Sequence, residues 1–116
     1  MTIKRIHPGN RLSQAVIAGG LVFVSGQVSK NKAGASVTEQ TQDILGIIDG
    51  ILAEAGTDKS KLVSASIWLT DISTFEEMNK VWDGWTPEGG APARATVEAK
   101  LAAPQFKVEI AVVAAT

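Results

Sequence analysis

The segment FKVEIAVV, from Phe106 to Val113, is the most informative part of the chain for its architecture. Its alternating pattern predicts a β-strand with apolar side chains on both faces. One face carries Val108, Ile110 and Val112, and the other carries Ala111 and Val113. A strand that is apolar on both sides is usually covered on both sides. We therefore expect both faces of this strand to be covered.

The segments upstream predict the rest of that sheet and its helices. In chain order they are a hairpin over 15–25, a helix from Ser36 to Gly56, a strand over 62–69, a helix from about Ser73 to Trp85, and a strand over 93–99. This order predicts an α+β fold, a mostly antiparallel mixed sheet with both helices on one face, in a single domain over residues 1–116. Two helices cover only one face, so we expect the other face to pack against further subunits.

Short-range signals define the ends of these elements. Gly19-Gly20 predicts a tight hairpin turn. Ser36 precedes Glu39 at the spacing of a capping box, and Gly56 stands where a left-handed residue ends the helix. A similar spacing predicts that the second helix begins near Ser73.

Composition excludes several classes of function. The chain has 116 residues, a net charge of −1, no cysteine and one histidine, His7, which we expect in a loop. Disulfide scaffolds, thiolate metal sites, thiol nucleophiles and multi-histidine sites are therefore excluded. Balanced charge argues against nucleic acid or an anionic membrane as a partner. No signal peptide or membrane-length apolar run is visible, so we expect a soluble cytoplasmic protein.

Two charged residues do not fit a solvated surface. Arg94 begins a strand directly after a proline-rich loop, and Glu109 lies inside the most apolar strand. If these two strands are neighbours, folded about Ala103-Pro104, both charges fall in one region. An arginine there can hold a carboxylate with two hydrogen bonds, and a partly desolvated carboxylate can accept a proton from water. The alternative is a purely structural ion pair between the two residues.

Three further positions are weaker candidates. Ser25-Gly26-Gln27 ends a strand and could direct backbone N–H groups toward a ligand, although without further context a simple turn explains it better. Thr96 has the same strand parity as Arg94 and could line the same pocket. Asn79 lies on the second helix beside the core residue Met78, a position typical of a residue at the boundary between core and surface.

The chain resembles the reactive-intermediate deaminase (Rid, or YjgF-like) family. The resemblance rests on LVFVSGQV from Leu21 to Val28, PARATVE from Pro92 to Glu98, and KVEI from Lys107 to Ile110, and it covers nearly the whole chain. It implies a homotrimer with ligand sites between subunits. It also implies hydrolysis of enamines and imines, such as 2-iminopropanoate, to 2-keto acids and ammonia, without a metal or organic cofactor.

The same resemblance assigns roles to individual residues. Arg94 matches the arginine that binds the substrate carboxylate, and Glu109 matches the acid that orients or activates water. Ser25 and Gly26 match a pair that lines the site, and Asn79 matches an asparagine of the second helix.

Two positions depart from the family pattern. Thr96 stands where many members have cysteine, and Leu12 stands where the best-studied branch has tyrosine. The loss of the tyrosine leaves carboxylate binding intact and bears on substrate range and rate. Two other functions stay open at this point: a non-catalytic trimer that binds or senses small carboxylates, and an endoribonuclease or translation inhibitor.

Overall fold

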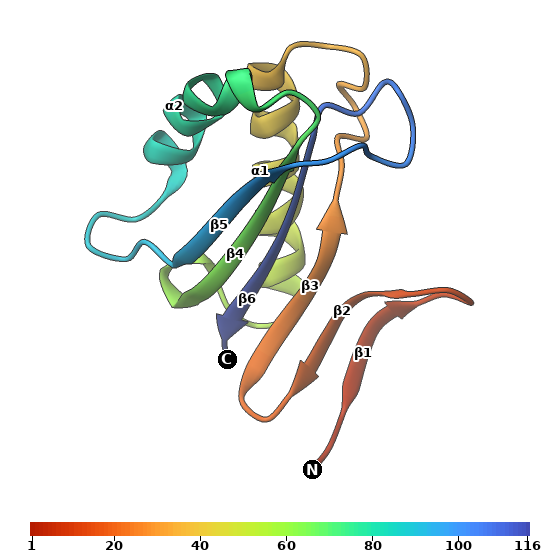
Figure 1. Ribbon diagram of the computed structural model, residues 1–116. Coiled ribbons are helices and arrows are strands. Elements are labelled where there is room, and N and C mark those ends of the chain that lie inside the picture. The colour runs from red at the N-terminus through yellow and green to blue at the C-terminus, as the bar shows by residue number, and fades with distance from the viewer.

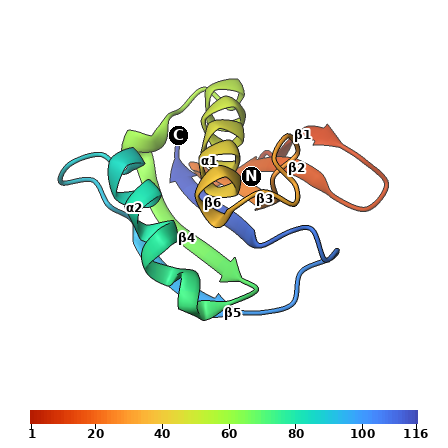
Figure 2. The same cartoon turned by 90° about the horizontal axis from the view of Figure 1, so that it is seen from above.

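Six strands form one mixed sheet, and two helices pack on one of its faces (Figures 1 and 2). A computed structural model describes all residues 1–116. The strands and helices are β1 (Lys4–Pro8), β2 (Ser13–Ala18), β3 (Leu21–Gln27), α1 (Val37–Glu54), β4 (Leu62–Leu69), α2 (Phe75–Trp85), β5 (Ala93–Glu98) and β6 (Val108–Ala115). Short 3₁₀ turns, η1 (Lys59–Lys61) and η2 (Ile72–Thr74), precede β4 and α2.

The strands lie in the order β1-β2-β3-β6-β4-β5, and only β4 and β5 run parallel. The predicted α+β fold class is therefore confirmed. One strand, β1, was not predicted. Its sequence KRIHP buries only Ile6. An edge strand with a single buried side chain shows no alternation of apolar and polar residues, so the sequence pattern did not indicate it.

The predicted hairpin and the first helix are confirmed. Gly19 and Gly20 adopt φ angles of 60° and 78°, the left-handed conformation that a two-residue type I′ turn requires. The Ser36 hydroxyl accepts a hydrogen bond from the Glu39 amide at 3.1 Å and caps α1. Gly56, with φ 82°, follows the end of α1 as predicted. Local sequence signals were sufficient for these boundaries.

The predicted start of α2 near Ser73 is wrong. The Asp71 carboxylate accepts hydrogen bonds from the amide and hydroxyl of Ser73 and caps η2, so α2 begins only at Phe75. Thr74 precedes α2 without a side-chain cap. Glu77 instead ties α2 to α1, because its carboxylate accepts from the amide and hydroxyl of Thr38, both at 2.9 Å.

The two faces of the sheet differ in what covers them. Along β6, residues 108, 110, 112 and 114 are buried beneath the helices, while the alternate residues stay partly exposed on the other face. That second face, which we call the open face, also carries Phe23, opposite Val113, and Val97, opposite Trp68. Phe23 is 44% exposed and Val97 is 50% exposed. An apolar second face is thus confirmed, as the strand pattern predicted.

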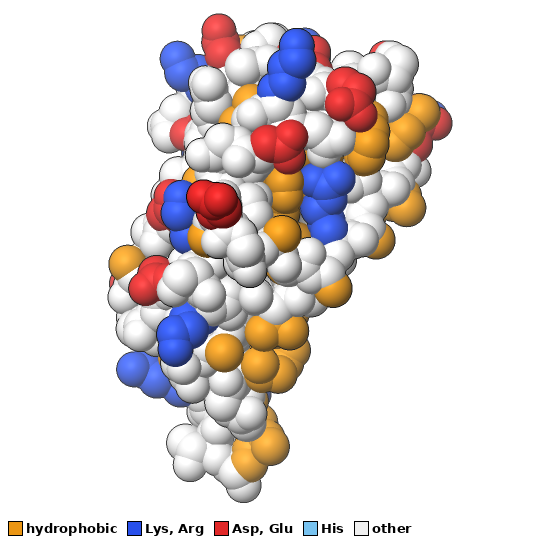
Figure 3. Space-filling model, turned by 90° about the vertical axis from the view of Figure 1, so that its left-hand side faces the viewer, with side chains coloured by type: hydrophobic (Ala, Val, Ile, Leu, Met, Phe, Trp, Pro, Cys, Tyr) orange, Lys and Arg blue, Asp and Glu red, His pale blue; other side chains and the backbone are white.

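The figures show how this face is presented. In Figure 1, α1 lies behind the sheet and the open face is turned toward the viewer. In the space-filling view of Figure 3, hydrophobic side chains follow the right-hand side of the molecule, where the open face lies. Neither helix is long and apolar enough to cross a membrane.

Candidate active site

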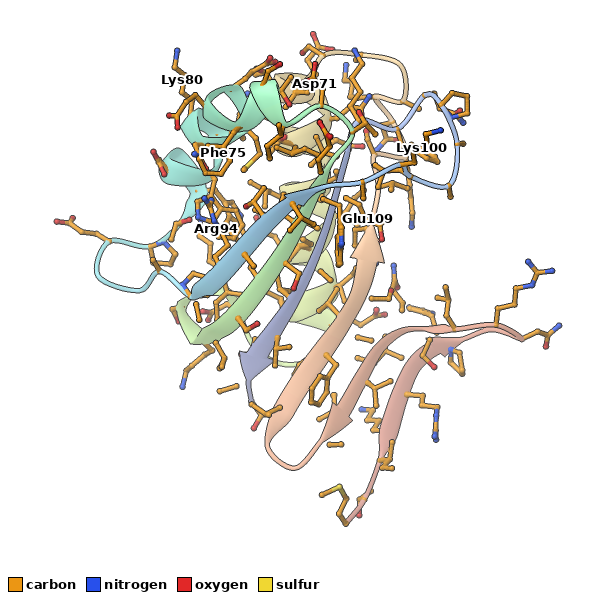
Figure 4. All side chains as sticks on the ribbon, viewed as in Figure 1. Asp71, Phe75, Lys80, Arg94, Lys100 and Glu109 are labelled. Atoms are coloured by element: carbon orange, nitrogen blue, oxygen red, sulfur yellow. The ribbon has the colours of Figure 1, made fainter.

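Arg94 lies on the helix side of the sheet, next to α2. Its partner in β4 is Ala65, which is buried beneath the helices. The Arg94 Cζ atom lies 5.6 Å from the centre of the Phe75 ring and 5.3 Å from that of the Trp82 ring. Both distances are within the range of cation–π contacts. Figure 4 shows Arg94 directly below Phe75 of α2.

The guanidinium of Arg94 has no acidic partner in the chain. The single ion pair of the structure joins His7 to Glu54, and no side-chain hydrogen bond involves Arg94. A half-buried guanidinium carries five N–H donors, and leaving such donors unpaired is costly. These unused donors make Arg94 a suitable receptor for an anion from outside the chain.

Two other predicted residues lie beside Arg94. Thr96 is paired with Ile67, a buried residue beneath the helices, so Thr96 shares the face of Arg94 as its parity predicted. Asn79 lies between Phe75 and Trp82 on α2, four residues after the first. The Oγ1 atom of Thr96 and the Oδ1 atom of Asn79 are both buried without a hydrogen-bond partner. Buried polar atoms normally have partners, so these two atoms are exceptions that lie next to Arg94.

Glu109 lies on the open face, on the opposite side of the sheet from Arg94. It pairs with Trp68 of β4, and its carboxylate lies directly over Gly26 of β3. A Cβ atom at Gly26 would overlap that carboxylate, so any other residue there would force the Glu109 side chain to move. The pairing of β3 with β6 shifts between Val24 and Gln27, which places Ser25 and Gly26 in a β-bulge. Bulges of this kind often redirect groups next to active sites.

A hollow of about 360 Å³ adjoins this bulge. Ser25, Gly26 and Leu12 all line it, and Leu12 is 62% exposed at its rim. The Ser25 hydroxyl is fixed by donating to the carbonyl oxygen of Gln14 at 3.0 Å. The other lining residues are His7, Gln14, Gln27, Val28 and Lys30.

Sequence reasoning missed the contribution of His7 to this hollow. His7 lies in β1 and not in a loop, has a left-handed φ of 47°, and binds the Glu54 carboxylate through Nε2 at 2.8 Å. A single histidine carries no pattern that would have indicated this position. No group of three or more His, Cys, Asp or Glu side chains is arranged to hold a metal ion.

The expectation that Arg94 and Glu109 share one region of the chain is wrong. Strand β4 lies between β5 and β6, with Ala65 opposite Arg94 and Trp68 opposite Glu109. Strand spacing and rise place the two α-carbons about 14 Å apart. The two side chains also lie on opposite faces of the sheet and form no ion pair, so the alternative of a structural ion pair within the chain is wrong as well.

The predicted residues thus fall into two groups, which we call the arginine half-site and the glutamate half-site. The arginine half-site consists of Asn79, Arg94 and Thr96. The glutamate half-site consists of Leu12, Ser25, Gly26 and Glu109.

Comparisons with known proteins cover nearly the full length of the chain. The model of the family described as Endoribonuclease L-PSP matches residues 2–116. A RutC family protein of Haemophilus influenzae is 44% identical over 114 residues, with 98% of each chain covered. The RutC family protein YoaB of Escherichia coli is 44% identical over 115 residues, with 99% of each covered. Among solved structures, NMB1025 of Neisseria meningitidis, a member of the YjgF protein family, is 46% identical and superposes with a TM-score of 0.96, covering 100% of this chain and 96% of that one.

Proposed function

The chain belongs to the YjgF family, whose sequence model is described as Endoribonuclease L-PSP, and on this premise we propose that it hydrolyses small 2-imino acids, such as 2-iminopropanoate, to 2-keto acids and ammonia. The observation that carries the proposal is the pair of complementary half-sites. One holds an unpaired guanidinium with free N–H donors, and the other holds a carboxylate beside a solvent-accessible hollow. A carboxylate receptor and a water-orienting carboxylate are the two groups that hydrolysis of an imino acid requires.

The half-sites lie on opposite faces, so the reaction needs two copies of the chain. We propose a homotrimer in which the arginine half-site of one copy faces the glutamate half-site of the next. A cyclic assembly uses two different surfaces on each copy, as two separate half-sites require. The open face supports this arrangement, because exposed Phe23 and Val97 are the kind of apolar surface that subunit contacts cover.

In the proposed reaction Arg94 donates two hydrogen bonds to the substrate carboxylate and so fixes the imine carbon. A water molecule held by Glu109 attacks that carbon, and the carboxylate accepts a proton from the water as the C–O bond forms. The imine nitrogen takes up the C=N π electrons and the proton that Glu109 accepted, which gives the tetrahedral carbinolamine. The carbinolamine hydroxyl then loses its proton, which Glu109 relays to nitrogen, the C–N bond breaks, and ammonia leaves as the C=O bond forms. One water is consumed for each ammonia released.

Asn79 and Thr96 lie next to Arg94 in this cleft, and their buried Oδ1 and Oγ1 atoms have no hydrogen-bond partner in the single chain. In the proposed site these two side chains rotate when the cleft assembles and bind the imino acid. Leu12 at the rim of the hollow supplies apolar surface where a tyrosine would supply a hydroxyl, which favours imino acids with an apolar side chain.

The test generates 2-imino acids with an amino-acid oxidase and traps the persisting imine with semicarbazide. The wild-type protein is expected to lower semicarbazone formation, and Arg94→Ala and Glu109→Gln are expected not to. A wild type that binds pyruvate but leaves semicarbazone formation unchanged would identify a non-catalytic carboxylate-binding protein instead.

The family description also names an endoribonuclease. The net charge of −1 and the single histidine, held by Glu54, do not favour binding and cleavage of RNA. Incubation of the protein with labelled RNA at low and high salt tests this directly, and salt-sensitive cleavage that survives Arg94→Ala would favour it over deamination.

A further inference from the structure

Helix α2 places two aromatic rings against the one guanidinium that the proposed reaction uses. Phe75 and Trp82 are seven residues apart, which is two helical turns, so both rings leave the same face of α2. The Trp82 side chain is only 4% exposed, and its ring also packs against Trp85 at 5.3 Å. The rings are therefore fixed by the core before any ligand binds.

Aromatic stacking has a particular consequence for an arginine. A guanidinium that contacts rings through its flat faces keeps its in-plane N–H donors free. A carboxylate partner within the chain would instead occupy those donors. The two acidic residues in the first turn of α2 are engaged elsewhere, since Glu77 accepts from Thr38 and Glu76 lies 3.4 Å from the Asn79 amide nitrogen.

We propose that Phe75 and Trp82 are positioning residues, which hold the Arg94 guanidinium in the orientation that binds the substrate carboxylate. This inference rests on the proposed function. A free arginine side chain samples many rotamers and must be ordered on binding, whereas a stacked one is already ordered. The expected effect of removing one ring is therefore a loss of carboxylate affinity of about 3- to 10-fold.

The experiment compares two disruptive variants, Trp82→Leu and Phe75→Leu, with a conservative variant, Trp82→Phe, that keeps an aromatic ring. Val81→Ala is the matched control. Val81 belongs to the same helix and packs against the core, but it lines the hollow between α1 and α2 with Leu45 and Gly46. Loss of packing alone would affect the control as well.

Kinetics separate positioning from general destabilisation. Trp82→Leu and Phe75→Leu are expected to raise KM for the imino acid and the inhibition constant of pyruvate about 3- to 10-fold with little change in kcat. Inhibition by pyruvamide, which lacks the negative charge, is expected to stay unchanged. Trp82→Phe and Val81→Ala are expected to remain within about twofold of wild type. Equal losses for pyruvate and pyruvamide would overturn the inference.

A spectroscopic measurement tests the inference independently of activity. The chain has three arginines, Arg5, Arg11 and Arg94, so their Nε–Hε signals can be resolved by NMR and the third assigned with Arg94→Lys. Ring currents are expected to shift the Arg94 signal in the wild type and not in Trp82→Leu. An unshifted Arg94 signal would overturn the inference even in an active enzyme. A shifted signal in a protein without imine hydrolysis would refute the proposed function, and pyruvate binding would then test the positioning role.

Discussion

Mixing two inactive variants should restore activity if each active site is shared between copies. Arg94→Ala removes the arginine half-site and Glu109→Gln impairs the glutamate half-site, which lie on opposite faces of the sheet. In an assembly that contains both variants, a cleft between the intact Glu109 of one chain and the intact Arg94 of its neighbour carries both functional groups. Neither variant alone can form such a cleft.

The expected magnitudes follow from this geometry. Loss of the arginine–carboxylate contact removes about 2 to 4 kcal/mol, a fall in kcat/KM of roughly 30- to 1,000-fold. Loss of the group that activates water lowers the rate about 100- to 10,000-fold. After equal amounts of the two variants are combined at random, about one quarter of the clefts receive both intact residues. The mixture is therefore expected to recover about one quarter of wild-type activity.

The assay is the semicarbazide competition applied to differently tagged variants that are unfolded together in urea and refolded. Recovery of both tags in one assembly confirms mixing. Each variant refolded with itself is the control and should stay inactive. If mixed assemblies form but remain as inactive as the single variants, Arg94 and Glu109 do not act across a shared cleft and the proposed site is refuted.

Three further predictions concern individual residues. Gly26→Ala should lower imine hydrolysis while the far-UV circular dichroism stays native, because the added Cβ displaces the Glu109 carboxylate; full activity would contradict this geometry. Gly46→Ala, in α1 with nothing within 4 Å, should raise the free energy of unfolding by about 0.5–1 kcal/mol in urea titrations, and a decrease would show a hidden clash. The Ser29 hydroxyl, with further help from Asn31, lowers the pKa of Asp43 to about 2, below its usual value in the unfolded chain. The ionised Asp43 carboxylate therefore stabilises the fold above about pH 4, and this stabilisation is lost as the pH falls toward 2. Over this range the Tm of Asp43→Asn should fall less than the Tm of the wild type. Parallel curves of Tm against pH for the two proteins would refute this reasoning.

The local parts of the fold could be predicted because short-range physics controls them. Two adjacent glycines form the turn of the β2–β3 hairpin, and Ser36 caps the helix whose apolar face repeats every three to four residues. The start of α2 was wrong for an equally local reason. The Asp71 carboxylate accepts from the amide of Ser73 and caps a 3₁₀ turn over Ile72–Thr74, and this turn comes before the helix.

The candidate site could be predicted only in part. The residue types of Arg94 and Glu109 stood out, because a charge in a strand with an apolar pattern needs a partner. Their surroundings could not be predicted. The stacking of Arg94 on Phe75 and Trp82, and the carboxylate of Glu109 over Gly26, join segments that lie far apart in the chain.

The amino-acid sequence was enough to establish the helices, five of the six strands, the turn and the apolar character of both faces of β6. Each of these depends on spacing within a short window, which the chain carries in its own order of residues. The order of strands depends on non-local pairing, and only the tertiary structure showed that β4 lies between β5 and β6. Side chains alternate across each strand, so that insertion and its register put Arg94 and Glu109 on opposite faces of the sheet. The two residues therefore belong to separate half-sites.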